Sequence, residues 1–151
     1  MKYLKTFEAI DRVKILDFND TFVNQIKKLY SHLINIFDDL GYDYNNYYDN
    51  GSYETLFNYD NVDERFKLTL NPKNQTLEVE ISESNLLYIT NYFKTIDGLS
   101  EIRSSDIYSH QTRSIFTAEI IFKITKNIDY IISQISKDDF QLKMNTNKYN
   151  L

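Results

Sequence analysis

Cysteine and tryptophan are absent from this chain of 151 residues, which also has only three Gly and one Pro. Without Cys, the chain forms no disulfide, no thiolate nucleophile and no Cys-ligated zinc site. The three glycines, at positions 41, 51 and 98, are too far apart to build a phosphate-binding loop or a dinucleotide-binding fingerprint. We therefore expect neither a cofactor nor a bound metal.

Clustered positive charge is lacking as well. The 17 Lys and Arg are scattered and are outnumbered by 22 Asp and Glu, which gives a net charge of −5. Because a phosphate backbone is bound by grouped basic side chains, nucleic acid is not expected as the main ligand. No apolar run approaches the roughly 18 residues of a membrane-spanning helix, and charged residues stand where a secretory signal would be apolar. We therefore expect a cytoplasmic protein without a membrane partner.

Aromatic side chains are abundant, with 13 Tyr and 10 Phe, and the length suits a single domain with its own core. The clearest pattern lies in the last third of the chain. Apolar residues alternate over Phe116–Ile124, which is the period of a strand, and then recur every three or four positions over Ile128–Ile135. The segment predicts a central strand that leads into a packed helix over residues 125–137, with Thr125 as its N-cap.

A hairpin is the next clearest prediction. Two alternating segments, residues 65–70 and 77–81, flank the turn sequence Asn-Pro-Lys-Asn-Gln. If Leu70 faces Leu77, the side chains of Lys67 and Glu80 form a favourable pair on the solvent side. Two independent features therefore predict the same register.

The first helix is predicted over residues 20–40 from one long apolar stripe, with Asn19 as N-cap and Gly41 as the residue that ends it. Residues 1–18 are interpreted as a helical start that no clear pattern defines, and the tail from residue 146 as frayed. The other expected elements are a loop at 42–52, a strand at 53–59, a helix at 84–96, a strand at 99–108, a polar turn at 109–112 and a short last strand through Phe140, Leu142 and Met144.

This order of elements predicts an α+β fold with an antiparallel sheet and helices packed mainly on one face. From residue 76 onward the order is β-α-β-β-α-β, the ferredoxin-like order. From residue 20 to residue 137 it is α-β-β-β-α-β-β-α, and this order together with the acidic charge resembles the chaperones of type III secretion effectors. That resemblance implies an acidic homodimer that keeps an unfolded client soluble.

Candidates for catalysis or metal binding are few. His110 stands in the predicted polar turn with Tyr108 and Arg113 nearby, and these groups at a hairpin tip suit metal-independent cleavage of a phosphodiester, although such tips are commonly polar. His32 is interpreted as a boundary or surface side chain of the first helix. Residues 43–54 have the length of a calcium-binding loop, but Gly51 stands ninth where such a loop needs Gly in sixth place.

A Tyr-rich and Asp-rich segment after the first helix is the main candidate for binding. Tyr is enriched at protein interfaces because it offers rigid contact area and one hydroxyl. The competing interpretation is a solvated loop whose composition reflects an AT-rich genome. Ile121 is a second candidate, because it points away from the apolar face of its strand. The predicted partner-binding residues are Tyr42, Tyr44, Tyr47, Tyr48, Asp43, Asp49 and Ile121.

The first eight residues, MKYLKTFE, resemble the opening of many small proteins of contractile-tailed bacteriophages. This resemblance implies an accessory or virion protein located in the host cytoplasm or in the particle. The leading hypothesis is accordingly a non-enzymatic module, accessory or anti-defence in role, that binds a host or virion protein. The alternatives are the chaperone-like dimer and the nuclease that uses His110.

Overall fold

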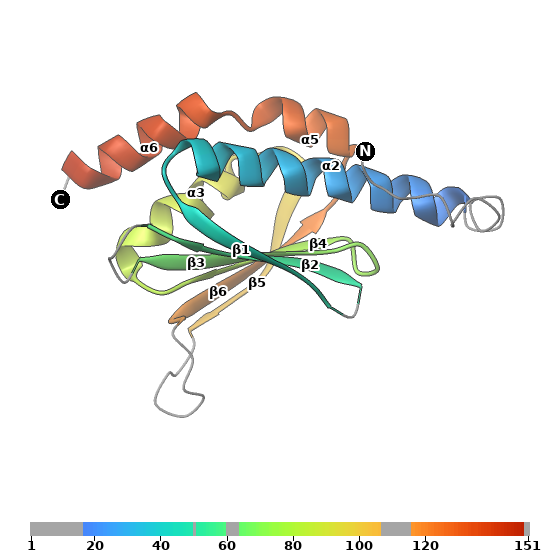
Figure 1. Ribbon diagram of the computed structural model, residues 1–151, viewed down its shortest axis with the longest axis horizontal. Coiled ribbons are helices and arrows are strands. Elements are labelled where there is room, and N and C mark those ends of the chain that lie inside the picture. The colour runs from blue at the N-terminus through green and yellow to red at the C-terminus, as the bar shows by residue number, and fades with distance from the viewer. Residues whose placement is uncertain (1–16, 50, 60–63, 107–115, 150–151) are drawn as a thin grey trace.

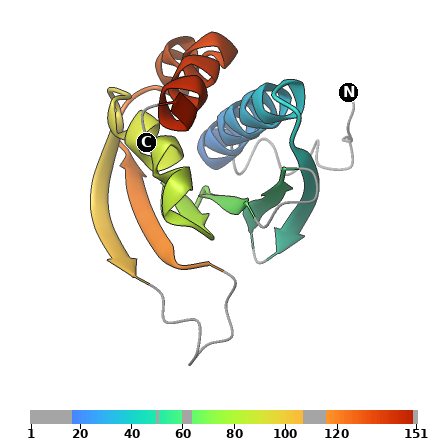
Figure 2. The same ribbon diagram turned by 90° about the vertical axis from the view of Figure 1, so that its left-hand side faces the viewer.

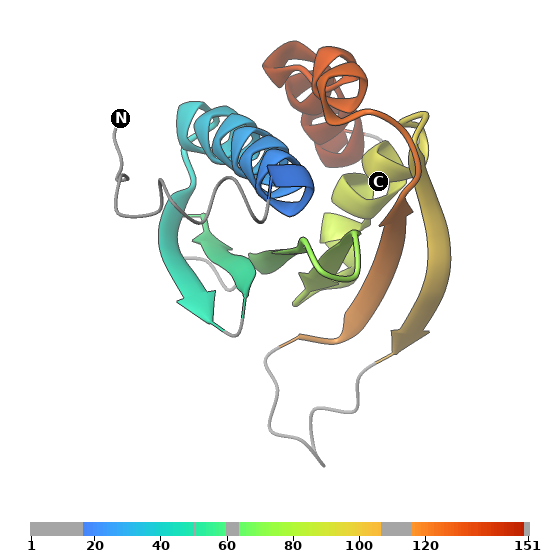
Figure 3. The same ribbon diagram turned by 90° about the vertical axis from the view of Figure 1, so that its right-hand side faces the viewer.

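The computed structural model describes residues 17–49, 51–59, 64–106 and 116–149, which form a mixed α+β domain. Its six strands make one antiparallel sheet in the order β1-β2-β3-β4-β6-β5. The sheet curves around the helices, which all lie on its concave side (Figures 1, 2 and 3). We call this side the inner face and the other side the outer face. The predicted α+β class, with helices on one face of an antiparallel sheet, is confirmed.

The helices are α2 (Asp17–Asp39), the 3-10 turn η2 (Ser84–Leu86), α3 (Leu87–Lys94), α5 (Ile128–Gln134) and α6 (Lys137–Tyr149). The strands are β1 (Asp43–Asp49), β2 (Ser52–Asn58), β3 (Arg65–Asn71), β4 (Thr76–Ile81), β5 (Leu99–Asp106) and β6 (Ala118–Ile124).

Helix α2 lies along the inner face of the sheet, as its apolar stripe predicts. Ile26, Leu29, Leu33 and Phe37 are almost completely buried, while Lys27, Lys28, Ser31 and Asn35 on the opposite side of the helix are exposed. Gly41 has a positive φ of 99°, which suits the residue that ends a helix. The helix already begins at Asp17, so Asn19 lies inside its first turn and the prediction of an N-cap there was wrong.

The hairpin β3–β4 has the predicted register. Leu70 pairs with Leu77 and Lys67 with Glu80. The Nζ of Lys67 lies 3.0 Å from the Oε2 of Glu80 on the outer face. Strand alternation sets this register, because a slip of one residue would move every apolar side chain of the strand from the core to the outer face.

Strands β4 and β5 run parallel to each other with β6 between them, and α3 connects the two. This is a split β-α-β arrangement, which keeps the first five elements of the predicted β-α-β-β-α-β order. The sixth element differs, because residues 137–149 form helix α6 in place of a strand. Phe140 is completely buried, whereas Leu142 is 63% exposed, so the two do not share a face.

Four further predictions were wrong in detail. Residues 43–49 form strand β1 and are not part of a loop. The side chain of Asn127, not Thr125, caps α5 by accepting from the backbone N–H of Asp129 at 2.8 Å. Ile135 has an extended backbone, so α5 ends at Gln134 and a second helix follows. Phe116 precedes β6 and lies under the ammonium of Lys67, 5.5 Å from the ring centroid, outside the main core cluster.

Aromatic rings fill the middle of the core. The ring of Phe37 lies 4.8 Å from that of Phe66, 5.1 Å from that of Phe57 and 4.8 Å from that of Phe140, measured between centroids. These contacts join α2 to two strands and to α6. The sheet edge formed by β1 is therefore supported by a dense aromatic core on its inner side.

Candidate interaction surface

Strand β1 is a regular edge strand. It pairs with β2 over seven consecutive residues, and within the described part of the chain no other strand pairs with it. The opposite edge strand, β5, has an irregular register between Glu101 and Arg103. Bulges of this kind, Pro and Lys are the usual features that keep a sheet edge from pairing with another chain. The sequence of β1, DYNNYYD, has none of them.

The side chains of β1 alternate between the two faces of the sheet. Tyr44, Asn46 and Tyr48 pair with Phe57, Thr55 and Tyr53, which belong to the inner face. Asp43 and Tyr47 therefore point to the outer face. Tyr47 is 53% exposed and Tyr48 67% exposed, so large rings are accessible on both sides of the edge.

The backbone groups that face away from β2 can be assigned from the register. Asp49 pairs with Ser52, and only two residues separate them in the chain. In a hairpin with a two-residue loop, the pair that closes the loop exchanges backbone hydrogen bonds, and the next pair does not. Because the two kinds of pair alternate, the N–H and C=O groups of Tyr44, Asn46 and Tyr48 point to the free edge. Three residues of β1 thus offer donors and acceptors to a further strand.

A polar network fixes this edge to α2. The Oδ1 of Asn46 accepts from the hydroxyl of Thr55 at 2.9 Å, and the hydroxyl of Tyr30 donates to the backbone carbonyl of Glu54 at 2.9 Å. The hydroxyl of Thr55 is also within hydrogen-bond distance of that of Tyr30. Burial raises the pKa of Tyr30, because a phenolate would lose its water there. The edge is therefore held by side chains as well as by the ladder to β2.

Tyr42 does not belong to the exposed surface, so its prediction as a partner-binding residue was wrong. It is 2% exposed, and its ring packs against Phe37 and Phe66. Its hydroxyl lies 2.9 Å from that of Tyr88, in the core. The alternation along the strand explains this position, because residues 42, 44, 46 and 48 all face inward and only residue 42 lies deep beneath α2.

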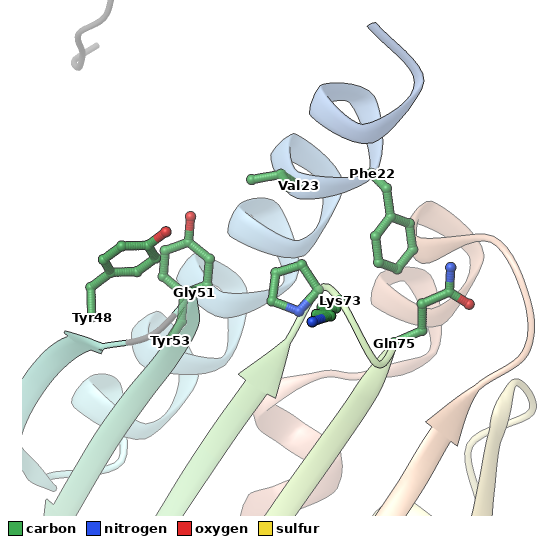
Figure 4. Close-up of a pocket in the computed structure, with 8 residues that line it drawn as sticks. Phe22, Val23, Tyr48, Gly51, Tyr53, Lys73 and Gln75 are labelled. Atoms are coloured by element: carbon green, nitrogen blue, oxygen red, sulfur yellow. The ribbon is translucent and has the colours of Figure 1, made fainter. Parts of the chain in front are cut away.

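A hollow of about 430 Å³ lies at the end of the β1–β2 hairpin, and we call it the tip pocket. Figure 4 shows Phe22 pointing from α2 towards Gln75, with the rings of Tyr48 and Tyr53 side by side on the hairpin. Those two rings are 4.9 Å apart, and burial raises the pKa of Tyr53 to about 12. The pocket is lined by Phe22, Val23, Tyr48, Gly51, Tyr53, Pro72, Lys73 and Gln75.

Charge is distributed unevenly along the chain around β1. Residues 29–64 contain eight of the 22 acidic residues and none of the 17 Lys and Arg. This segment therefore carries a charge of −8, and the remainder of the chain carries +3. Of the described acidic side chains, Asp38 and Asp39 end α2, Asp43 begins β1, and Glu54 lies on the neighbouring strand. The edge strand thus lies within a strongly acidic segment of the chain that has no basic residue.

No known protein family matches this chain, and neither curated proteins nor solved structures gave a match. The functional assignment therefore depends on the site itself. Within residues 17–49, 51–59, 64–106 and 116–149, no helix is long and apolar enough to cross a membrane. In the same part of the chain, no group of three His, Cys, Asp or Glu side chains is arranged to hold a metal ion.

Ile121 lies on the outer face, as predicted, between the buried residues Ile120 and Phe122. It pairs with Glu78 on one side and with Arg103 on the other. Burial raises the pKa of Glu78, and the carboxylates of Glu119 and Glu80 raise it further. Ile121 lies four strands away from β1, so the structure does not place it on the same surface as the exposed tyrosines.

The predictions for the two histidines have different outcomes. The Nε2 of His32 lies 2.7 Å from the backbone carbonyl of Ile135, so this ring connects α2 to the segment between α5 and α6. His110, Tyr108 and Arg113 lie outside the described residues, and the nuclease hypothesis stays a prediction. The segment of calcium-loop length forms the paired strands β1 and β2, which do not wrap around an ion.

The tip pocket and the edge were not predicted from the sequence. A signal for the β1–β2 hairpin was available, because Asn50-Gly51 between two Tyr-containing segments is typical of a β-hairpin, but it does not indicate which strand lies at the edge. No comparable signal existed for the pocket, whose lining comes from α2 and from two hairpins far apart in the chain.

Proposed function

We propose that this protein is a non-enzymatic binding module whose β1 edge receives an extended, basic segment of a partner protein. The observation that carries the proposal is the regular edge of β1, with exposed tyrosines on both faces and three N–H groups that no strand of the described residues pairs with. Main-chain hydrogen bonds to such an edge supply affinity, and the alternating side chains supply specificity. A phage-encoded accessory or anti-defence role is a further hypothesis, under which the partner is a host or virion protein.

The charge around β1 selects a basic partner. A strand that runs antiparallel to β1 has one residue opposite Asp43 and another, six positions earlier, opposite Asp49. Lys or Arg at these two positions forms favourable cross-strand pairs. Between them, apolar residues are expected opposite Tyr44 and Tyr48, since these rings lie on the inner face.

The same charges disfavour pairing between two copies of this chain. Full-length antiparallel pairing of β1 with its own copy places Asp43 of each copy opposite Asp49 of the other. Like charges that lie directly opposite each other destabilise a ladder. The chaperone-like dimer is therefore the weaker candidate for this edge.

The backbone contribution is tested with a matched pair of variants at Tyr44, using the labelled peptide FKVTTTVK as the bound segment. Tyr44→Ala removes the ring and keeps the N–H, whereas Tyr44→Pro also removes the N–H that faces the free edge. Fluorescence anisotropy should show a larger loss of affinity for Tyr44→Pro than for Tyr44→Ala, at similar thermal stability. Equal losses would contradict strand addition.

The charge contribution is tested by a swap at Asp43. Asp43→Lys should weaken binding of FKVTTTVK and strengthen binding of FKVTTTVE, in which the last residue is acidic. Failure of the charge-swapped peptide to gain affinity would contradict the proposed position of the partner. Sedimentation provides a further check, because a dimer that Tyr44→Pro dissociates would place a second copy of this chain on the edge.

A further inference from the structure

We infer that the tip pocket receives an aromatic side chain of the segment that pairs with β1. This inference rests on the proposed function and adds to it the identity of an anchor residue. Strand addition commonly combines main-chain pairing with a pocket for a particular side chain. A few such anchors supply most of the binding free energy at protein interfaces.

The register places the anchor near the pocket. A partner residue opposite Tyr48 points to the inner face, and so does the residue two positions earlier, which lies past the end of β1, opposite position 50 and next to Gly51. Gly51 has a positive φ of 81°, and a Cβ built there would have no atom within 4 Å. The tip of the hairpin therefore leaves room for a side chain to pass from the free edge into the pocket.

The lining favours an aromatic ring over an aliphatic side chain. Phe22, Tyr48 and Tyr53 supply ring edges and faces at which a further ring can pack edge-to-face. Lys73 is the one charged residue of the lining, and none of the ion pairs in the described part of the chain uses it. Its ammonium is available to lie over the face of a bound ring.

The experiment uses the full chain and three labelled peptides that differ only in their first residue, which is Phe, cyclohexylalanine or Ala in FKVTTTVK. Cyclohexylalanine has nearly the shape of Phe but no π face. Anisotropy titrations should rank Phe first, and replacement of Phe by Ala should lower the affinity roughly five- to tenfold. Cyclohexylalanine should lie between the two. Equal affinities for Phe and Ala, or for Phe and cyclohexylalanine, would overturn the inference.

Two variants of the protein locate the effect in the pocket. Val23→Trp fills the pocket from α2 and should reduce affinity for the Phe peptide to that for the Ala peptide, without changing the latter. Lys73→Met removes the exposed cation and should abolish the preference for Phe over cyclohexylalanine. An unchanged preference in both variants would place the anchor elsewhere.

The two proposals fail in distinguishable ways. If the peptides bind with a dependence on Tyr44→Pro but not on their first residue, strand addition stands and the pocket anchor is overturned. If no peptide binds up to about 1 mM, a free energy weaker than about −4 kcal/mol, the proposed function is overturned together with the anchor.

Discussion

The hydroxyl groups of Tyr42 and Tyr88 lie 2.9 Å apart in the core, at the junction of α2, β1 and α3. Each hydroxyl gives the other a hydrogen-bond partner where burial denies both of them most of their water. The pair joins the start of the edge strand to the first helix that follows β4. Its disruption is therefore expected to affect the fold more than the exposed surface.

Replacement of one member of this pair should lower the free energy of unfolding at least as much as replacement of both. Tyr42→Phe leaves the hydroxyl of Tyr88 without this partner, at a cost of about 1–3 kcal/mol in the free energy of unfolding. In Tyr42→Phe/Tyr88→Phe no hydroxyl is left unpaired, so the double variant should be no less stable than the single one. Urea denaturation of the four proteins measures the coupling. Additive losses would show that the hydroxyls do not depend on each other.

Stability should decrease above about pH 10. Burial raises the pKa of Tyr88 from 10.0 to about 12 and also raises the pKa of Tyr42. Between pH 10 and about pH 12, tyrosines of the unfolded chain release protons that Tyr42 and Tyr88 retain in the folded chain, so rising pH favours unfolding. The contribution is fully present below pH 10 and is lost towards pH 12. Melting temperatures measured from pH 8 to 11 should fall less steeply for Tyr42→Phe/Tyr88→Phe than for the unmodified protein.

Helix α6 provides a test of which face of the last element is buried. Phe140→Ala should cost about 3–5 kcal/mol, because its completely buried ring lies 4.1 Å from that of Tyr92 and 4.8 Å from that of Phe37. Leu142→Ala is the control and should change stability by no more than about 0.5 kcal/mol, because Leu142 is exposed. Similar losses at both positions would indicate a strand, in which the two side chains share a face.

The N-cap of α5 can be located by mutation. Asn127→Ala removes the side-chain acceptor for the backbone N–H of Asp129 and should cost about 1 kcal/mol. Thr125→Ala, at the position favoured by periodicity alone, should have almost no effect. A larger loss at Thr125 than at Asn127 would contradict the observed start of the helix. Thermal denaturation followed by circular dichroism is sufficient for the comparison.

The predictions that were confirmed come from periodic patterns that act over short distances. The alternation of Phe66, Leu68 and Leu70 predicts a strand, and its match with Leu77 predicts the register of the β3–β4 hairpin. The prediction was wrong for β1, whose Tyr and Asn residues on both faces give no apolar alternation. It was also wrong for α6, because Phe140 and Met144 fit a helical spacing as well as a strand spacing.

The α+β class, the long first helix and the pairing of β3 with β4 can be predicted from the chain alone, because each follows from the spacing of apolar residues along one segment. Three features follow from the three-dimensional arrangement instead: β1 is an edge of the sheet formed by the described residues, Tyr42 is buried while Tyr47 and Tyr48 are exposed, and a pocket lies at the hairpin tip. These features depend on which strand has no neighbour and on contacts between residues distant in the chain. Local periodicity carries no information about either.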